Sequence, residues 1–220
     1  MSFKTQKEIE KIFERIEAIV KNKPKTMLDE VSNQVGMDPF KVLISTILSH
    51  RTRDENTKKA VEKLFLNYKD AWSLSKANIK EVRKLIRPVG FYKIKSKRII
   101  EISRILVKNF DGKVPNEIEK LLSLPGVGRK TANCVLVYAF NKPAIPVDTH
   151  VHRISNRIGL VHTKNPLETE IELRKVIPRK YWLKINKLLV SFGQTICKPI
   201  NPKCYECSIK NFCEFYKANA

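Results

Sequence analysis

Apolar residues recur every three or four positions through most of this chain. The period is clear in residues 9–20, 54–65 and 129–140, where it places the apolar side chains on one face of a helix. The segment of residues 40–48 is apolar on nearly every side, which predicts a helix at the centre of a core. No segment alternates apolar and polar residues over a useful length. The pattern therefore predicts an all-α fold.

A long basic helix is predicted between residues 93 and 110. Its apolar set begins at Ile94, and this face is expected to point towards the core. The opposite face would turn five basic residues towards solvent or towards phosphate groups. These are Lys93, Lys95, Lys97, Arg98 and Arg104.

Two predicted helices are joined by a short loop with two glycines, in the sequence Leu-Pro-Gly-Val-Gly-Arg-Lys-Thr-Ala at residues 124–132. The first of these helices is expected to begin at Asn116, because Glu119 follows three residues later as in a capping box. Gly126 and Gly128 free the backbone of the turn, and they leave the N–H groups at the start of the second helix without side chains over them. Such a hairpin can bind a phosphate group, and the alternative is an ordinary tight turn between packed helices.

The chain of 220 residues is strongly basic, with 43 Lys and Arg against 22 Asp and Glu and a formal charge of +21. This excess favours a polyanionic partner, while a solvated lysine-rich surface is the alternative. Hydrophobic residues make up 42% of the chain, which is enough for one large domain or two small ones. No apolar run approaches the ~20 residues that span a bilayer, and residues 1–8 lack the apolar segment of an export signal. We therefore expect a cytoplasmic protein with no membrane partner.

Four of the five cysteines lie close together, in the spacing C-x6-C-x2-C-x5-C, after a last helix expected from Tyr181 to Ile196. They are Cys197, Cys204, Cys207 and Cys213. Four thiolates in so short a segment are expected to bind one metal centre. A zinc ion would favour two closely spaced pairs, and only one such pair is present, so the spacing favours an iron–sulfur cluster over zinc. Disulfides are the alternative.

Lys130 is expected in the first turn of the helix that follows the glycine hairpin. The helix dipole and the neighbouring Arg129 both disfavour a further positive charge there, which favours the uncharged and nucleophilic amine. The alternative is an ordinary surface lysine among the 43 basic residues. Asp148 is expected to cap a helix of residues 149–158 that Gly159 ends, and a capping carboxylate stays ionised. Lys130 and Asp148 are thus candidates for a nucleophile and its charged partner.

Residues 124–132, followed by Val-Asp-Thr-His at residues 147–150, resemble the helix-hairpin-helix of the DNA glycosylase superfamily and are similar to its endonuclease III branch. The cysteine spacing is similar to that of the [4Fe-4S] loop of the same family. The resemblance implies an all-α fold of two domains. One would be a helical domain of residues 28–140 with the hairpin, and the other an iron–sulfur cluster domain of residues 1–27 and 141–220.

The resemblance also implies roles for single residues. Lys130 would form a Schiff base with the sugar, and Asp148 would stabilise the positive charge that develops on it. Arg51 aligns with a glutamine that in this family usually fills the gap left by the extruded base, and Phe91, in a second and weaker hairpin, is a further candidate wedge. The remaining candidates for DNA binding are Gly126, Gly128, Arg129 and His150.

The activity that the resemblance implies is that of a bifunctional DNA glycosylase and abasic-site lyase of base excision repair. Such an enzyme removes oxidised pyrimidines from double-stranded DNA that contains damaged bases or abasic sites, and it cuts the strand 3′ to the abasic site by β-elimination. Residues 43–47 contain no acidic side chain, which argues against the related adenine glycosylases. A monofunctional mismatch DNA glycosylase and a non-catalytic iron–sulfur DNA-binding protein are the alternatives. We expect a monomer that is associated with the nucleoid.

Overall fold

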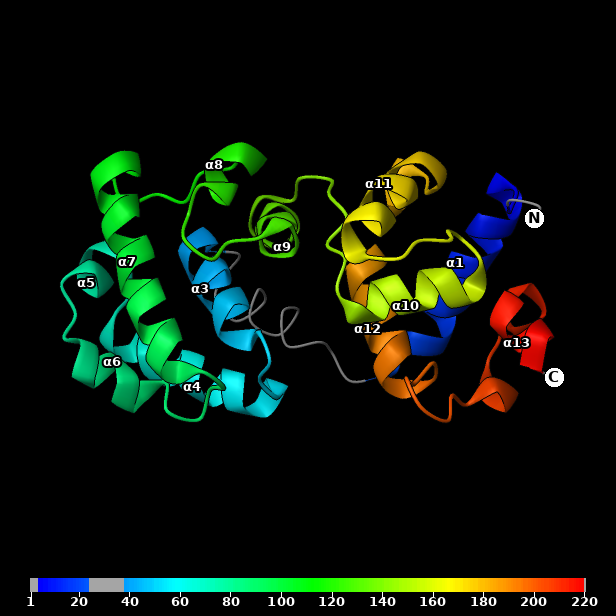
Figure 1. Cartoon of the computed structure of the whole chain (residues 1–220), viewed down its shortest axis with the longest axis horizontal. Coiled ribbons are helices and arrows are strands. Elements are labelled where there is room, and N and C mark those ends of the chain that lie inside the picture. The colour runs from blue at the N-terminus through cyan, green and yellow to red at the C-terminus, as the bar shows by residue number, and fades with distance from the viewer. Residues whose placement is uncertain (1–3, 24–37, 220) are drawn as a thin grey trace. The chain divides into compact units, whose positions relative to one another are not determined.

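The computed structural model describes residues 4–23 and 38–219 (Figure 1). Within these ranges every regular element is a helix, which confirms the prediction of an all-α fold. The described residues form two compact units, which we call the terminal unit (residues 4–23 and 143–219) and the central unit (residues 38–142). The domain boundary expected between residues 27 and 28 lies outside the described residues.

The central unit is built around the helix that the apolar run predicts. Its helices are α3 (Pro39–Ser49), α4 (Asp54–Asn67), α5 (Ala71–Ser75), α6 (Ile79–Leu85), α7 (Tyr92–Phe110), α8 (Ile118–Leu122) and α9 (Arg129–Phe140). Asp38 caps α3 by accepting a hydrogen bond from the Lys41 N–H, and residues 42–48 are all buried. α3 packs against α4, α7 and α9, and it is therefore the centre of this core.

Helix α7 differs from its prediction at its first turn. Ile94, expected in the core, is 57% exposed, whereas Lys95, expected at the surface, is only 5% exposed. The helical period of the segment is right, but its phase at this end is wrong. A buried ammonium group is tolerated where hydrogen bonds replace its hydration, and Lys95 finds three acceptors here, which are described below.

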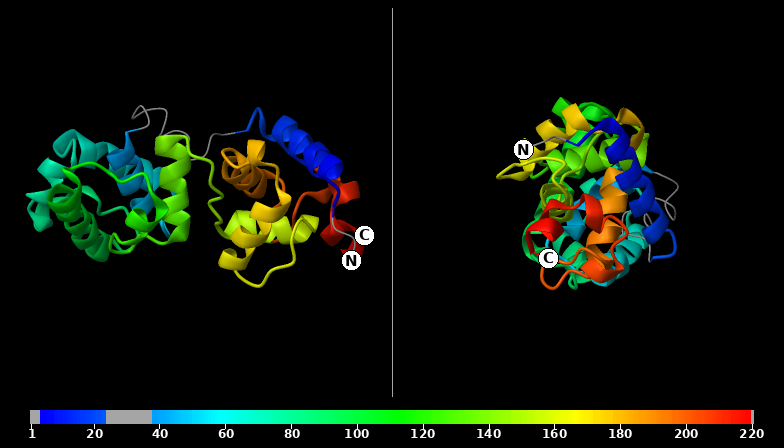
Figure 2. Two further views of the ribbon diagram at one scale, coloured as in Figure 1. Left: turned by 90° about the horizontal axis from the view of Figure 1, so that it is seen from above. Right: turned by 90° about the vertical axis from the view of Figure 1, so that its right-hand side faces the viewer.

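The terminal unit joins the start of the chain to its end. Its helices are α1 (Gln6–Val20), α10 (Thr149–Ile158), α11 (Pro166–Val176), α12 (Ile185–Thr195) and α13 (Glu214–Asn219), with 3-10 turns η1 (Arg179–Tyr181), η2 (Cys204–Glu206) and η3 (Lys210–Phe212). α1 lies against α12 (Figure 2), and Ile9, Ile12, Phe13 and Ile16 enter a core formed with α10 and α12. Burial of this apolar face fixes the N-terminal helix beside segments that are far from it in the sequence.

The predicted ends of three helices can be compared with the structure. Asp148 caps α10 as predicted. The prediction that Asn116 caps α8 is wrong, because Glu117 takes the cap position without a side-chain hydrogen bond. The last helix was expected from Tyr181 to Ile196, but Tyr181 belongs to the separate turn η1, and α13 follows the cysteines. α13 has only six residues, too few for an apolar period to show.

Candidate functional site

The glycine hairpin joins α8 to α9 in the central unit. Gly126 has a φ of 71°, and a Cβ atom there would lie 2.2 Å from Nε of Arg98, so this position requires glycine. Gly128 caps α9 without a side-chain hydrogen bond, and a Cβ atom there would meet nothing within 4 Å. The start of α9 is therefore open where the first N–H groups of the helix point outwards, which is a geometry that binds anions.

Lys130 is the second residue of α9, and it lies half-buried beside a polar contact. The next residue, Thr131, is 2% exposed, and its Oγ1 lies 3.2 Å from Nε2 of His50 in the loop after α3. Burial, together with the nearby charges of Lys130, Lys95 and Arg98, lowers the pKa of His50 to about 4. His50 is therefore a neutral imidazole at pH 7 and adds no positive charge beside Lys130.

His50 is a residue of this site that the sequence does not reveal. Its partner Thr131 is 81 residues away in the chain, and one histidine in a basic loop carries no spacing that would reveal this contact. The only signal in the sequence for this contact is that His50 lies next to Arg51 and that Thr131 lies next to Lys130.

Arg51 and Phe91 come together on neighbouring loops of the central unit. Their φ angles are 50° and 58°, and both side chains are exposed, that of Phe91 by 57%. The guanidinium carbon of Arg51 lies 5.8 Å from the centre of the Phe91 ring, within range of a cation–π contact. The structure thus presents a cation and an aromatic ring side by side.

Asp148 belongs to the terminal unit, where it begins α10. Its Oδ1 accepts hydrogen bonds of 2.9 Å from the N–H groups of His150 and Val151. Among the described residues, no group donates a hydrogen bond to Oδ2 of Asp148, so this oxygen can interact with a ligand. The two hydrogen bonds at the helix start fix the orientation of the carboxylate.

His150 is packed inside the terminal unit against α12. Its Nδ1 lies 3.2 Å from a guanidinium nitrogen of Arg153, and a Cβ atom at Gly193 would lie 2.4 Å from the same Nδ1. Gly193 on α12 therefore leaves the space that the imidazole ring occupies. The ring is half-buried, and a role in DNA binding stays a prediction.

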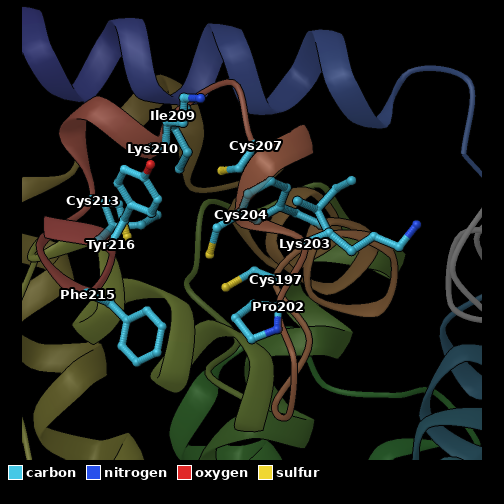
Figure 3. A pocket seen from close by; sticks show the side chains of 13 residues that line it. Cys197, Pro202, Lys203, Cys204, Cys207, Ile209, Lys210, Cys213, Phe215 and Tyr216 are labelled. Carbon is cyan, nitrogen blue, oxygen red and sulfur yellow. The ribbon is translucent and has the colours of Figure 1, made fainter. Parts of the chain in front are cut away.

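The four clustered cysteines line one pocket of the terminal unit, between α10, α12 and the segments around η2 and η3 (Figure 3). All four are free thiols, and none is fully exposed. Burial raises the pKa of Cys207 to about 11 and also raises the pKa of Cys213. Thiolates at such a site need a cation to stabilise them, which a metal centre supplies.

The donor set of this pocket consists of four cysteine thiols. Among residues 4–23 and 38–219, no three His, Cys, Asp or Glu side chains are arranged to hold one metal ion. In a [4Fe-4S] cluster each cysteine binds a different iron atom, so the four sulfur atoms need not converge on a single point. The chemistry of this all-thiol pocket therefore fits an iron–sulfur cluster.

Arginines of two helices hold the cysteine loop in place. Arg153 of α10 donates to the Cys197 carbonyl oxygen at 2.8 Å. Arg157, one turn later, donates to the Lys198 carbonyl oxygen at 2.7 Å and lies 3.7 Å from the Cys197 sulfur atom. Arg15 of α1 donates to the Ser208 carbonyl oxygen at 3.0 Å. The loop can form only a small apolar core by itself, and the hydrogen bonds from these charged donors add to its stability.

None of the helices in the described ranges combines the length and apolar character needed to cross a membrane.

Lys130 lies in the central unit and Asp148 in the terminal unit, so each of the two compact units carries one of the candidate catalytic residues.

Comparison with known proteins identifies the family. Residues 44–179 match the HhH-GPD superfamily of base excision DNA repair proteins. The chain is 57% identical to endonuclease III of Thermotoga maritima over 185 residues, which are 84% of this chain and 87% of that protein. It is similar to the structure of a trapped covalent intermediate of endonuclease III with DNA, with a TM-score of 0.85, 30% identity and 99% of each chain covered. It is also similar to a thermostable thymine-DNA glycosylase, with a TM-score of 0.84, 27% identity, and 96% of this chain and 98% of that chain covered. The chain therefore belongs to the endonuclease III family of the helix-hairpin-helix DNA glycosylase superfamily, as the hairpin and the cysteine spacing predicted.

Proposed function

We propose that the protein is a bifunctional DNA glycosylase and abasic-site lyase of base excision repair that acts on oxidised pyrimidines in double-stranded DNA. The observation that carries this proposal is Lys130, a half-buried residue in the first turn of α9, directly after an open glycine hairpin. A related endonuclease III has been trapped as a covalent intermediate with DNA, which requires a nucleophile on the enzyme.

The chemistry begins with the uncharged amine of Lys130. Its lone pair attacks C1′ of the damaged nucleotide, the bond from C1′ to the base breaks, and the base leaves with the bonding electrons and takes up a proton. Opening of the sugar ring then gives an imine between Lys130 and C1′. Loss of a proton from C2′ expels the 3′ phosphate by β-elimination, and water finally hydrolyses the imine to release Lys130.

Asp148 is the charged partner in this proposal. Its ionised carboxylate stabilises the positive charge that develops on the sugar as the base departs. The two N–H groups that bind Oδ1 fix the orientation of the carboxylate, while Oδ2 is left to face the sugar.

DNA binding would use the open glycine hairpin and the exposed pair of Arg51 and Phe91, which we call the wedge. The N–H groups near Gly126 and Gly128 bind a phosphate, and Arg129 adds a positive charge. Arg51 and Phe91 fill the gap that an extruded base leaves in the stack. His150, beside Asp148, is a further candidate on the phosphate side.

Cys197, Cys204, Cys207 and Cys213 would hold a [4Fe-4S] cluster. When bound, the cluster supplies structural cross-links between four points of the cysteine loop. The lysines of this loop, Lys198, Lys203 and Lys210, can then face phosphate groups as part of a rigid surface. We propose that the protein works as a monomer on damaged DNA of the nucleoid, with the two domains predicted from the sequence.

Borohydride trapping tests the proposal. Wild type and Lys130→Ala are each incubated with a duplex that contains one abasic site, and borohydride reduces any imine to a stable amine. A covalent complex with wild type and none with Lys130→Ala is the expected result. Lys108→Ala, at an exposed position in the last turn of α7, is the matched control and should trap as wild type does. No complex with any of the three proteins, with DNA binding intact, would exclude the lyase.

The similarity to a thymine-DNA glycosylase favours one alternative, a monofunctional mismatch glycosylase. That enzyme class removes the base and leaves the abasic site uncut. A duplex with a G·T mismatch distinguishes the two functions, because the alternative predicts strand breaks only after alkaline treatment, whereas a lyase cuts without it.

A further inference from the structure

Lys95 is a buried charge whose hydrogen bonds converge on one loop. Its ammonium nitrogen donates to the Leu48 carbonyl oxygen at 2.8 Å, to Thr52 Oγ1 at 3.1 Å and also to the His50 carbonyl oxygen. All three ammonium protons therefore have acceptors. Two of these acceptors lie at the C-terminal end of α3, where the helix dipole favours a cation. Lys95 thus fastens the first turn of α7 to the end of α3.

The same hydrogen bonds hold the two loops that carry Arg51 and Phe91. Thr52 Oγ1, which accepts from Lys95, also accepts from the Gly90 N–H at 3.1 Å. The two loops are closely packed, since a Cβ atom at Gly90 would lie 2.5 Å from the Arg51 carbonyl oxygen. One ammonium group and one hydroxyl group therefore link the residue before Phe91 with the residues on both sides of Arg51.

Arg51 and Phe91 both need such support. Each has a left-handed backbone conformation, which is unfavourable for a residue other than glycine and persists only where the surroundings impose it. The network from Lys95 supplies this restraint to both loops at once. The result is a guanidinium group and an aromatic ring that are held together and exposed.

A buried ammonium group loses its hydration, so a charged side chain joins two loops only at a cost in free energy. Burial lowers the pKa of Lys95 to about 8, with a smaller contribution from Arg98, so the amine is still largely protonated at neutral pH. An apolar side chain would avoid this cost but could not bind three oxygen atoms that face one point. The ammonium group keeps the loop in one conformation.

We propose that Lys95 is a positioning residue for base extrusion: it holds Arg51 and Phe91 as one preformed wedge that enters the DNA stack. The inference rests on the proposed glycosylase function. Because Lys95 is buried, its effect passes through the two loops. Without it, each wedge residue must be ordered during extrusion, and this raises the barrier to the step that exposes the base.

Extrusion distinguishes the two reactions of a bifunctional enzyme. A damaged base has to leave the stack before it can be removed, whereas a preformed abasic site has no base to extrude. Lys95→Met should therefore slow single-turnover excision of thymine glycol about tenfold or more, because a small misplacement at a remote point has effects of this size. Cleavage at a preformed abasic site in the same sequence should stay within about threefold of wild type.

Two further measurements complete the test. The fluorescence of 2-aminopurine opposite the lesion reports unstacking, and its rise should be slowed by Lys95→Met as excision is. Lys108→Met removes one charge from an exposed position of the same helix and should match wild type in both reactions. Equal losses of excision and cleavage would show that Lys95 only supports the fold, and no loss in either would also overturn the proposal.

A second variant decides the question if Lys95→Met does not fold. Thr52→Val removes the shared hydroxyl group but keeps the shape of the side chain, and it should give the same separation of the two reactions with a smaller loss of excision. If Thr52→Val excises thymine glycol as fast as wild type, the proposal is wrong. Failure of wild type itself to excise or to trap would instead refute the proposed function, so the two failures are distinguishable.

Discussion

Gly126→Ala and Gly128→Ala should separate the folding of the hairpin from its binding of DNA. An alanine at residue 126 keeps a φ of 71° only at a cost of about 1–2 kcal/mol, because its Cβ crowds the following carbonyl oxygen. The Cβ would also displace the Arg98 side chain, whose Nε lies 2.2 Å from its position. We expect Gly126→Ala to lower the melting temperature by about 2–8 °C, since 1 kcal/mol corresponds to about 2–4 °C at this chain length.

Gly128→Ala is the matched control in the same hairpin. Its φ of −92° suits any residue, and its Cβ would meet no atom within 4 Å. The loss of glycine at a helix cap costs a few tenths of a kcal/mol or more, and the reduced freedom of the unfolded chain offsets about 0.4–1 kcal/mol. Its melting temperature should therefore stay near that of wild type. Its methyl group covers the open start of α9, so its affinity for an abasic-site duplex should fall about tenfold.

Thermal unfolding by circular dichroism and fluorescence anisotropy with labelled DNA measure the two effects. The reasoning predicts a stable Gly128→Ala with weak DNA binding and a destabilised Gly126→Ala. If both variants melt as wild type does, the crowding inferred at residue 126 is wrong. If Gly128→Ala binds DNA as tightly as wild type, the hairpin does not bind phosphate through its N–H groups.

Further predictions concern the other candidate residues. Asp148→Asn should retain the cap of α10, because an amide oxygen accepts the same two hydrogen bonds, but it should slow base excision about 100-fold or more in single-turnover assays because the charge is lost. The pKa of His50 is lowered from 6.5 to about 4, so the unfolded chain binds a proton there more readily, and the contribution of neutral His50 to stability is complete above pH 6.5 and is lost as the pH falls towards 4. Urea unfolding of wild type and His50→Asn across this range should show a weaker pH dependence in the variant. Cys204→Ser should lower the iron content per protein, whereas Cys134→Ala, in the core of the central unit, should leave the iron content unchanged.

The sequence predicts helices well where burial alone decides them. The apolar run of α3 and the face of α1 that carries Phe13 follow directly from the period of the apolar residues. The errors occur where a polar contact decides the outcome. Lys95 has the composition of a surface residue, and its burial depends on carbonyl groups 45 and 47 residues away in the chain. No local pattern shows those acceptors.

The candidate site could be named from the sequence, but its surroundings could not. Lys130 and Asp148 stand out by motif and by cap position, and their catalytic roles stay predictions. The contact between His50 and Thr131 and the pairing of Arg51 with Phe91 depend on how α3, α7 and α9 pack. Such contacts join separate segments of the chain, and only the folded structure brings them into view.

The two hairpins of the central unit each have a residue with a positive φ near the start of a helix, but they carry different side chains. Both hairpins contain a residue with a positive φ near the start of a helix that has no side-chain cap: Gly126 lies two residues before the cap position of α9, and Phe91 is itself the cap position of α7. In the hairpin before α9, a Cβ atom at Gly128 would meet nothing within 4 Å, so the backbone N–H groups at the helix start are open, which suits a phosphate. At Phe91 the hairpin carries an exposed ring instead, which suits contact with bases. Phe91→Gly should therefore spare the binding of undamaged DNA and slow base excision, whereas Gly128→Ala should weaken both. Equal effects of the two substitutions on undamaged DNA would show that the hairpins do not divide the tasks in this way.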